Sequence, residues 1–351
     1  MLAKSNGQSL EAHSVLVSKF AEKIAKQTIL DCDEKLLHVI KIAALLHDIG
    51  KCTIFFQNKL KRGFDEEQIE DSKPKNKKYR HNELSWAFLS RYFSGLKGED
   101  LNKVLNAVYW HHGISNEFGK YKDTDVIKDF STEEISLVSD FVTNILKKYD
   151  AENFYNYSIK EKEYTPKPQP SFYVNDENAS IKNAENLFIR SCIISADRLA
   201  SKYDSVNDDE ITNLVRNYNF VNYNFDFSKH KYFGSERFTQ QLEIVDSTLK
   251  TTQINAPAGF GKTLLGMLWA FKRNKRVIWV CPTNVVATSV YNSIIEELQH
   301  FGDNNVTVEL FLTSEVKKSN HKTFGFDSDI IVTNIDNYLT TTNLQLVPLN
   351  R

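Results

Sequence analysis

The stretch His47-Asp48-Ile49-Gly50-Lys51 follows directly on a dense apolar segment, residues 36–46. The apolar segment predicts a buried helix, and Gly50 stands where such a helix stops. A histidine next to an aspartate is a weak signal by itself, because such pairs often occur by chance. The weight of this pair depends on the residues that accompany it elsewhere in the chain.

The chain up to about residue 204 is predicted to be mostly helical, with further histidines and an aspartate on apolar faces or at helix ends. A single buried histidine is usually a core residue with satisfied hydrogen bonds. A carboxylate on an apolar face, however, is costly unless it is paired or binds a metal. The order of the set resembles the order of ligands in HD-type metal-dependent phosphohydrolases, so we interpret it as a metal site. Its members are His13, His47, Asp48, His81, His111, His112 and Asp197.

Imidazole and carboxylate donors together favour Mn, Fe, Co, Ni or Zn over a calcium site, which takes oxygen ligands. Because a carboxylate can give one oxygen to each of two ions, Asp48 is predicted to bridge a metal pair. We expect two divalent ions, with Mg a further candidate. The expected ligands are His13, His47, Asp48 and Asp197 for one ion, and Asp48, His81, His111 and His112 for the other.

The predicted catalytic residues are Asp48 and Lys51. Two bridged ions lower the pKa of a water and hold the attacking and leaving oxygens of a phosphodiester. Lys51 closely follows the histidine–aspartate pair and is expected to offset charge on the scissile phosphate. The alternative for Lys51 is an exposed lysine at a helix end.

After Gly234 the pattern changes to short β-type runs that alternate with helical ones. This alternation predicts a parallel α/β sheet. Strands are expected over residues 252–255, 277–281, 306–312 and 329–333, and helices from residue 262 and over residues 285–300.

A phosphate-binding loop is predicted over residues 256–263, between an expected strand and an expected helix. Small residues let backbone N–H groups wrap phosphates at a helix N-terminus. Lys262 would reach the β- and γ-phosphates, and Thr263 would hold Mg²⁺. Gln240 stands where helicases place an adenine-reading glutamine, although an ordinary surface glutamine is an equal alternative. The predicted ATP contacts are Gln240, Ala258, Gly259, Gly261, Lys262 and Thr263.

Two segments are candidates for nucleic-acid contact. A basic run just before His81 would track phosphates, and Tyr79 within it would stack on a base; a solvated loop is the alternative. Thr283 ends an expected strand, at a place suited to touching a nucleic-acid backbone. The predicted contacts are Lys75, Lys77, Lys78, Arg80 and Thr283.

Composition excludes several classes of protein. The 351 residues carry 44 Lys and Arg against 45 Asp and Glu, so the chain is not uniformly basic, and any nucleic-acid path must be local. The four cysteines form no CxxC pair, which argues against a disulfide scaffold or a thiolate zinc site. No apolar run is long enough for a membrane span, and no signal peptide is evident. We therefore expect no membrane partner and a cytoplasmic protein.

The predicted fold class is multidomain. An all-α HD-type phosphohydrolase domain over residues 1–205 is followed by a linker over 206–235 and a partial α/β RecA-like lobe over 236–351. ATP hydrolysis by such a lobe needs an acidic pair after a later strand, and none follows Thr333. We therefore expect the lobe to be incomplete.

The whole chain resembles the CRISPR-associated helicase-nucleases of type I interference systems. The segments that carry the resemblance are LAKS (residues 2–5), SLEAH (9–13), HDIGKCTIFFQ (47–57), WHHG (110–113), SADRLAS (195–201) and NAPAGFGKT (255–263). The resemblance implies cleavage of single-stranded DNA, an antiviral role, use of ATP with Mg²⁺, and delivery of DNA by an RNA-guided surveillance complex. It also implies the ligand and ATP residues named above. Two alternatives remain: an HD-type nucleotide phosphohydrolase, and a non-catalytic fragment that binds DNA or a partner.

Overall fold

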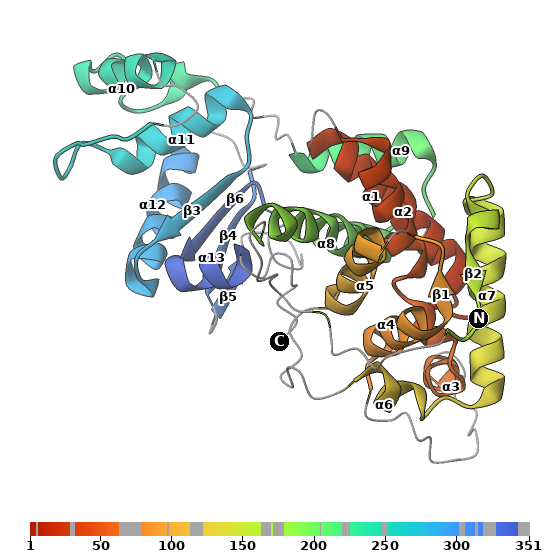
Figure 1. Ribbon diagram of the computed structural model, residues 1–351. Helices are drawn as coiled ribbons and strands as arrows, with labels where there is room; N and C mark the ends of the chain where they lie inside the picture. Colours follow the sequence, from red (N-terminus) through yellow and green to blue (C-terminus); the bar gives the residue numbers. More distant parts are fainter. Residues whose placement is uncertain are drawn as a thin grey trace. The chain divides into compact units, whose positions relative to one another are not determined.

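The computed structural model describes most of the chain in two compact units, Met1–Val215 and Arg216–Thr342 (Figure 1). Each unit is described by itself. No helix in the described residues is long and apolar enough to cross a membrane. The residues outside the description are 5, 29–31, 63–78, 97, 113–121, 163–169, 171–178, 204, 220–222, 224, 248–251, 302–305, 313–314, 319–327 and 343–351.

The first unit is helical, apart from one short antiparallel pair of strands, β1 with β2 (Figure 1). The helix α1 packs against both α2 and α8, and α5 packs against α2, α4 and α8. The elements are α1 (Leu10–Thr28), α2 (Glu34–Leu46), η1 (Ile49–Cys52), α3 (Ile54–Arg62), α4 (His81–Tyr92), β1 (Phe93–Ser94), α5 (Gly98–Trp110), α6 (Asp123–Ile127), α7 (Thr132–Tyr149), η3 (Phe154–Asn156), β2 (Ser158–Ile159), α8 (Ala179–Lys202) and α9 (Asp208–Asn219).

Apolar periodicity and side-chain caps explain these helices. Each of α1, α2 and α5 buries an apolar face, with Phe20, Ile40 and Val104 fully buried. The α2 helix begins where the Asp33 carboxylate accepts a hydrogen bond from the Leu36 N–H (2.6 Å). These short-range interactions define α1 and α2. The α2 helix leads directly into the histidine–aspartate stretch.

The second unit is a four-stranded sheet with helices packed on it (Figure 1). The strand order is β3-β6-β4-β5, in which β3, β6 and β4 run parallel and β5 is antiparallel to β4. Every residue of β4 and β6 is buried, as expected for parallel strands covered on both faces. The elements are η4 (Phe227–Lys229), α10 (Glu236–Ser247), α11 (Lys262–Arg273), β3 (Val277–Cys281), α12 (Asn284–Phe301), β4 (Val308–Leu312), β5 (Glu315–Lys318), β6 (Ile330–Asn334) and α13 (Ile335–Thr342).

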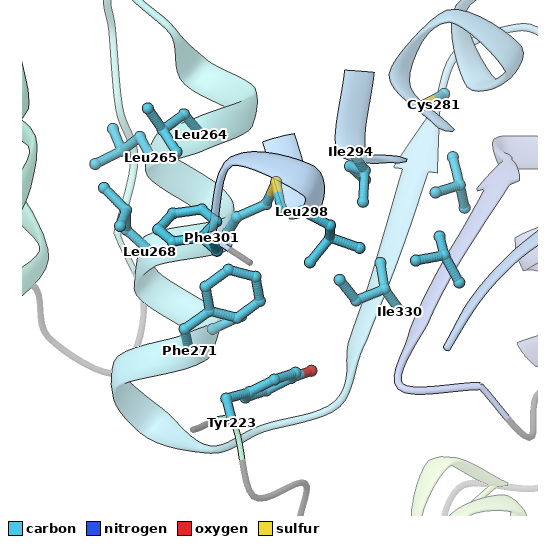
Figure 2. Close-up of a cluster of buried hydrophobic side chains, with 14 of the residues drawn as sticks. Tyr223, Leu264, Leu265, Leu268, Phe271, Cys281, Ile294, Leu298, Phe301 and Ile330 are labelled. Atoms are coloured by element: carbon cyan, nitrogen blue, oxygen red, sulfur yellow. The ribbon is translucent and has the colours of Figure 1, made fainter. Parts of the chain in front are cut away.

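A separate hydrophobic core holds the second unit together (Figure 2). Side chains of α11, such as Leu268 and Phe271, meet Leu298 and Phe301 of α12 and strand residues such as Ile330. Because this core is made from residues of the second unit alone, the unit has its own source of hydrophobic stabilisation.

The structure confirms the predicted fold class and corrects some details. Residues 252–255 form no strand, because β3 pairs with β6 alone among the described strands. The predicted linker contains the whole of α9, whose Ile211 and Val215 are buried despite the polar composition around them. The domain bounds at 205 and 236 stay a prediction. The prolines and charges of residues 161–178 predict a loop, and this stretch lies almost wholly outside the described residues.

Candidate metal centre and phosphate loop

Asp48 lies at the centre of a cluster of imidazoles in the first unit. Its carboxylate is almost completely buried. The oxygen Oδ1 lies 3.1 Å from His81 Nε2 and 3.4 Å from His111 Nε2. The other oxygen, Oδ2, lies 3.4 Å from His47 Nε2 and 3.7 Å from His13 Nε2. The two oxygens of Asp48 therefore face two different pairs of histidines.

The geometry brings all seven predicted ligands together in two adjoining groups. His13 Nε2 lies 3.0 Å from Asp197 Oδ1, and His81 Nε2 lies 2.5 Å from His112 Nε2. Each group has its donor atoms close enough together to hold one metal ion. The groups are Asp48, His81, His111 and His112, and His13, His47 and Asp197.

Backbone carbonyls fix the orientation of two of the imidazoles. His47 Nδ1 lies 2.7 Å from Ala44 O, and His111 Nδ1 lies 2.6 Å from Val108 O. A carbonyl can only accept, so each Nδ1 carries a proton, and Nε2 of each ring is the nitrogen that faces Asp48.

Three of these polar atoms are buried without a hydrogen-bond partner among the described residues: His47 Nε2, His111 Nε2 and Asp48 Oδ1. Such an atom costs about 1–3 kcal/mol unless something satisfies it. Both nitrogens lie 3.4 Å from an oxygen of Asp48, and all three atoms are good donors to a divalent transition metal. The residues therefore fit the expected pair of ions.

A glycine allows the histidine–aspartate turn to approach α4. A Cβ on Gly50 would lie 2.1 Å from the backbone oxygen of His81, so no larger residue fits there. The Gly50 N–H donates to Ser85 Oγ (2.8 Å), and Asn82 Nδ2 donates to Tyr109 O (2.6 Å). These bonds hold the start of α4 against η1 and the end of α5. They explain why His81 lies beside Asp48.

The charges in the centre favour metal binding. Burial alone would raise the pKa of Asp48, but His47, Lys51 and His81 hold it well below its ordinary value. Burial also lowers the pKa of His81 to about 4 and lowers that of His112. For His47, burial is outweighed by the adjacent Asp48, which raises the pKa. An ionised carboxylate beside the neutral imidazoles of His81 and His112 suits metal coordination.

Lys51 belongs to the centre rather than to an exposed helix end. Its side chain is 15% exposed, and Nζ lies 2.5 Å from Asp48 Oδ2. Burial would lower the pKa of Lys51, but Asp48 raises it, so the side chain stays cationic. A permanent positive charge at this place suits an anionic substrate.

The predicted phosphate loop precedes α11 in the second unit. Gly259 and Gly261 have φ angles of +78° and +82°, which favour glycine. Lys262 is the first residue of α11, and its Nζ donates to Ala256 O (2.7 Å) and Pro257 O (2.9 Å). The loop thus has the positive-φ glycines and the lysine at a helix start that phosphate binding needs.

A neighbouring glutamine was missed by the sequence interpretation. Gln240 is exposed and donates to Glu236 Oε1 (3.3 Å), whereas Gln241 is buried and donates to Phe260 O (2.8 Å) and Gly261 O (3.3 Å). Gln241 therefore lies against the phosphate loop. The helical spacing of Phe238, Gln241 and Val245 on one buried face was the available signal.

The predicted nucleic-acid contacts are placed only in part. Lys75, Lys77 and Lys78 lie outside the described residues, and Arg80 is exposed just before α4. The stacking role for Tyr79 is wrong, because this ring is buried and its hydroxyl donates to Asp125 O (3.1 Å).

Thr283 is exposed between β3 and α12. The next residue, Asn284, accepts a hydrogen bond from Asn334, the last residue of β6. The carboxyl ends of two parallel strands are therefore joined at this edge. Polar residues follow each of these two strands in the sequence, in agreement with this arrangement.

A helical histidine–aspartate metal centre is thus joined in one chain to an α/β unit with a phosphate loop. Residues 9–206 match the family model of the Cas3 HD domain, and residues 238–348 match that of the DEAD/DEAH box helicases. Because the first match covers more than half of the 351 residues, the chain belongs to the Cas3 HD-domain family. This confirms the resemblance, since a Cas3 HD domain is followed in one chain by a DEAD/DEAH box helicase domain. None of the curated proteins matches the chain.

Solved structures show the same fold. The crystal structure of T. fusca Cas3 has a TM-score of 0.55 at 16% identity, and covers 99% of this chain and 45% of that one. The T. fusca Cas3–AMPPNP structure has a TM-score of 0.54 at 15% identity, with the same coverage. This chain therefore spans less than half of the length of the relatives that it matches.

Proposed function

We propose that this chain is a metal-dependent nuclease that cuts single-stranded DNA in type I CRISPR interference. The position of Asp48 carries the proposal, because its two oxygens face separate groups of histidines. A carboxylate between two sets of neutral imidazoles supports two divalent ions side by side. Family membership supports a phosphodiester as the substrate.

The donor set supports Mn, Fe, Co or Ni, with Mg as a further candidate. One ion would be held by His13, His47, Asp48 and Asp197, and the other by Asp48, His81, His111 and His112. Such ions supply a water of lowered pKa and charge for the departing oxygen. Within the chain, Ala44 O and Val108 O orient two of the imidazoles, while the Lys51 ammonium attracts the phosphate.

The test is cleavage of circular single-stranded DNA with Mn²⁺, Ni²⁺ or Co²⁺. Asp48→Asn keeps the size of the side chain but removes the charge, and we expect a loss on the order of 10²-fold or more in rate. Asp150→Asn is the matched control. Its carboxylate is also buried, but it lies in a different network with His38, Lys41 and Tyr157.

Equal rates for the wild type and Asp48→Asn would refute the nuclease proposal. Rapid hydrolysis of free nucleotides with DNA left intact would favour the small-molecule phosphohydrolase. DNA binding by a chain that holds no metal would favour the non-catalytic alternative.

For the second unit we propose binding of ATP with Mg²⁺ through Ala258, Gly259, Gly261, Lys262 and Thr263. Gln240 stays a predicted adenine contact. The positive φ angles of the two glycines support close approach of the backbone to phosphates. Retention of ATP by the wild type and its loss in Lys262→Ala would support this role.

We also propose that an RNA-guided surveillance complex delivers the DNA. This rests on the family match and not on a surface of the chain. Cleavage of a displaced strand in a preformed R-loop, with and without the complex, tests it. Equal cleavage in both reactions would contradict the need for a partner.

A further inference from the structure

Residues 1–4 and 6–9 form a short hairpin. An antiparallel bridge joins Leu2 to Ser9, and the Ala3 N–H donates to Gln8 O (2.8 Å). Ala3 is buried at 2% exposure. We call residues 1–4 and 6–9 the N-terminal hairpin. Its hydrogen bonds lead to three elements of the first unit.

One side-chain amide joins the hairpin to the turn that carries Asp48. Gln57, on α3, accepts a hydrogen bond from Leu2 N–H (2.9 Å) and donates one to Leu2 O (3.0 Å). It also donates to Lys51 O (2.7 Å). Since Lys51 is three residues after Asp48, Gln57 connects the hairpin to the histidine–aspartate turn.

A lysine joins the hairpin to the helix that carries Asp197. Lys4 Nζ donates to Ala200 O (3.2 Å), one turn beyond Asp197 on α8. The last four carbonyls of a helix lack partners within the helix, and a positive charge is favourable there. Lys4 therefore fixes the end of α8 while it holds the tip of the hairpin.

The hairpin also leads directly into the helix that carries His13. The Leu10 N–H donates to Met1 O (3.0 Å), and the His13 N–H donates to Ser9 O (3.0 Å). The start of α1 is thereby fixed to both strands of the hairpin. The third connection of the hairpin is thus to the first turn of α1, which contains His13.

We propose that the N-terminal hairpin is a positioning device for one half of the metal centre, the group formed by His13, His47 and Asp197. The hairpin bonds α1 and α8 directly, and it reaches the turn that follows α2 through Gln57. The other group is positioned differently, through the Gly50–Ser85 and Asn82–Tyr109 hydrogen bonds. The inference rests on the proposed function, since it assigns the hairpin to one of two ions.

The physical basis is the demand of metal ligands for fixed geometry. Residues that orient ligands without touching the ion typically change metal affinity by about 10–100-fold when they are altered. Gln57 and Lys4 are such positioning residues, because each bonds a backbone carbonyl close to a ligand. Their loss is expected to weaken the binding of one ion and to leave the binding of the other unchanged.

The experiment compares full-length variants by calorimetric titration with Mn²⁺ and by the electron paramagnetic resonance signal of a coupled manganese pair. Gln57→Glu replaces a donor by an acceptor that faces two carbonyls, and Lys4→Met removes the charge. Lys4→Arg restores a cationic donor. Tyr157→Phe is the control, since it removes a buried hydrogen bond to Asp150, away from the hairpin.

We expect the wild type, Lys4→Arg and Tyr157→Phe to bind two ions and to show the coupled signal. Gln57→Glu and Lys4→Met should keep one ion at wild-type affinity and bind the second about 10–100-fold more weakly. Two ions at wild-type affinity in both variants, or equal weakening of both ions, would overturn the hairpin proposal alone. Fewer than two ions in the wild type would overturn the proposed two-metal function, and the hairpin assignment with it.

Discussion

Burial and mutual electrostatic interactions shift the pKa values of Asp48 and of the imidazoles around it. Burial keeps His81 and His112 neutral, while Asp48 stays ionised because positive and polar neighbours surround it. The His47 and His111 rings are oriented by hydrogen bonds from Nδ1 to carbonyls of the preceding helical turn. At the residue scale, the ligand side chains are therefore oriented for cation binding by the protein itself.

The lowered pKa of His81, about 4, predicts how stability depends on pH in the presence of a chelator. The unfolded chain takes up a proton near pH 6.5 and the folded chain only near pH 4, so stability is full above pH 6.5 and falls as the pH drops towards 4. His112 acts in the same direction. Urea unfolding at pH 4.5, 5.5 and 6.5 measures how the free energy of unfolding changes with pH. This change should be smaller in His81→Gln. An equal slope in both proteins would contradict this origin.

The two adjacent glutamines predict different effects on nucleotide binding. Gln241 donates a hydrogen bond to Phe260 O in the phosphate loop, and Gln241→Ala removes it. We therefore expect this variant to bind both ATP and inorganic triphosphate more weakly. If Gln240 contacts adenine, Gln240→Ala should weaken the binding of ATP and leave the binding of inorganic triphosphate unchanged. Competition titrations against a fluorescent ATP analogue separate these effects. Unchanged binding of both ligands in Gln241→Ala would show that the loop does not depend on it.

At the scale of elements, the centre depends on how closely η1 and α4 approach each other. Gly50 lies against the backbone of His81, and Ser85 Oγ bonds the Gly50 N–H. The α7 helix supports the same region, since Glu134 accepts hydrogen bonds from both Ser131 and Ile54. Backbone contacts, rather than ligand side chains alone, therefore set the spacing of the site.

Gly50→Ala should separate these elements. The added methyl would lie 2.1 Å from His81 O, a backbone atom, so overpacking is expected to cost about 1–3 kcal/mol and to weaken Mn²⁺ binding. Gly98→Ala is the matched control, because nothing lies within 4 Å of its Cβ position at the start of α5. Denaturant unfolding and Mn²⁺ titration measure both effects. Equal behaviour of the two variants would refute the close-packing explanation.

At the scale of the whole molecule, the chain has two cores and two separate kinds of ligand site. The metal centre lies entirely within Met1–Val215, and the phosphate loop lies within Arg216–Thr342. A ligand that binds only the folded state stabilises what it binds, by about 2.7 kcal/mol at a hundred times its Kd. Each ligand should therefore protect its own unit.

Hydrogen exchange resolved by segment measures this protection. Mn²⁺ should slow exchange in α1, α2, α4, α5 and α8, and an ATP analogue should slow it in α10 and α11. A chelator should reverse the first effect only. Protection of both units to the same degree by Mn²⁺ alone would contradict the division into two independent sites.

Much of this arrangement was predictable from local sequence. Apolar periodicity predicted a mostly helical chain up to about residue 204, with α2 over the segment 36–46, and β3 was predicted at its observed bounds. All seven expected ligands lie together in the structure. The predictions failed where pairing or burial depends on distant residues. Residues 252–255 look like a strand but form no ladder, and Tyr79 stands in a basic run but is buried by the segment around Asp125.

The sequence by itself determined the types of donor, the helices that carry them and the glycine loop before Lys262, because these follow from neighbours a few residues apart. Only the tertiary structure decided that the oxygens of Asp48 face different histidines, that Gln241 rather than Gln240 supports the loop, and that the N-terminal hairpin connects the elements around His13 and Asp197. Those relations join residues far apart in the chain. Their distances are set by how the helices pack, which local periodicity does not specify.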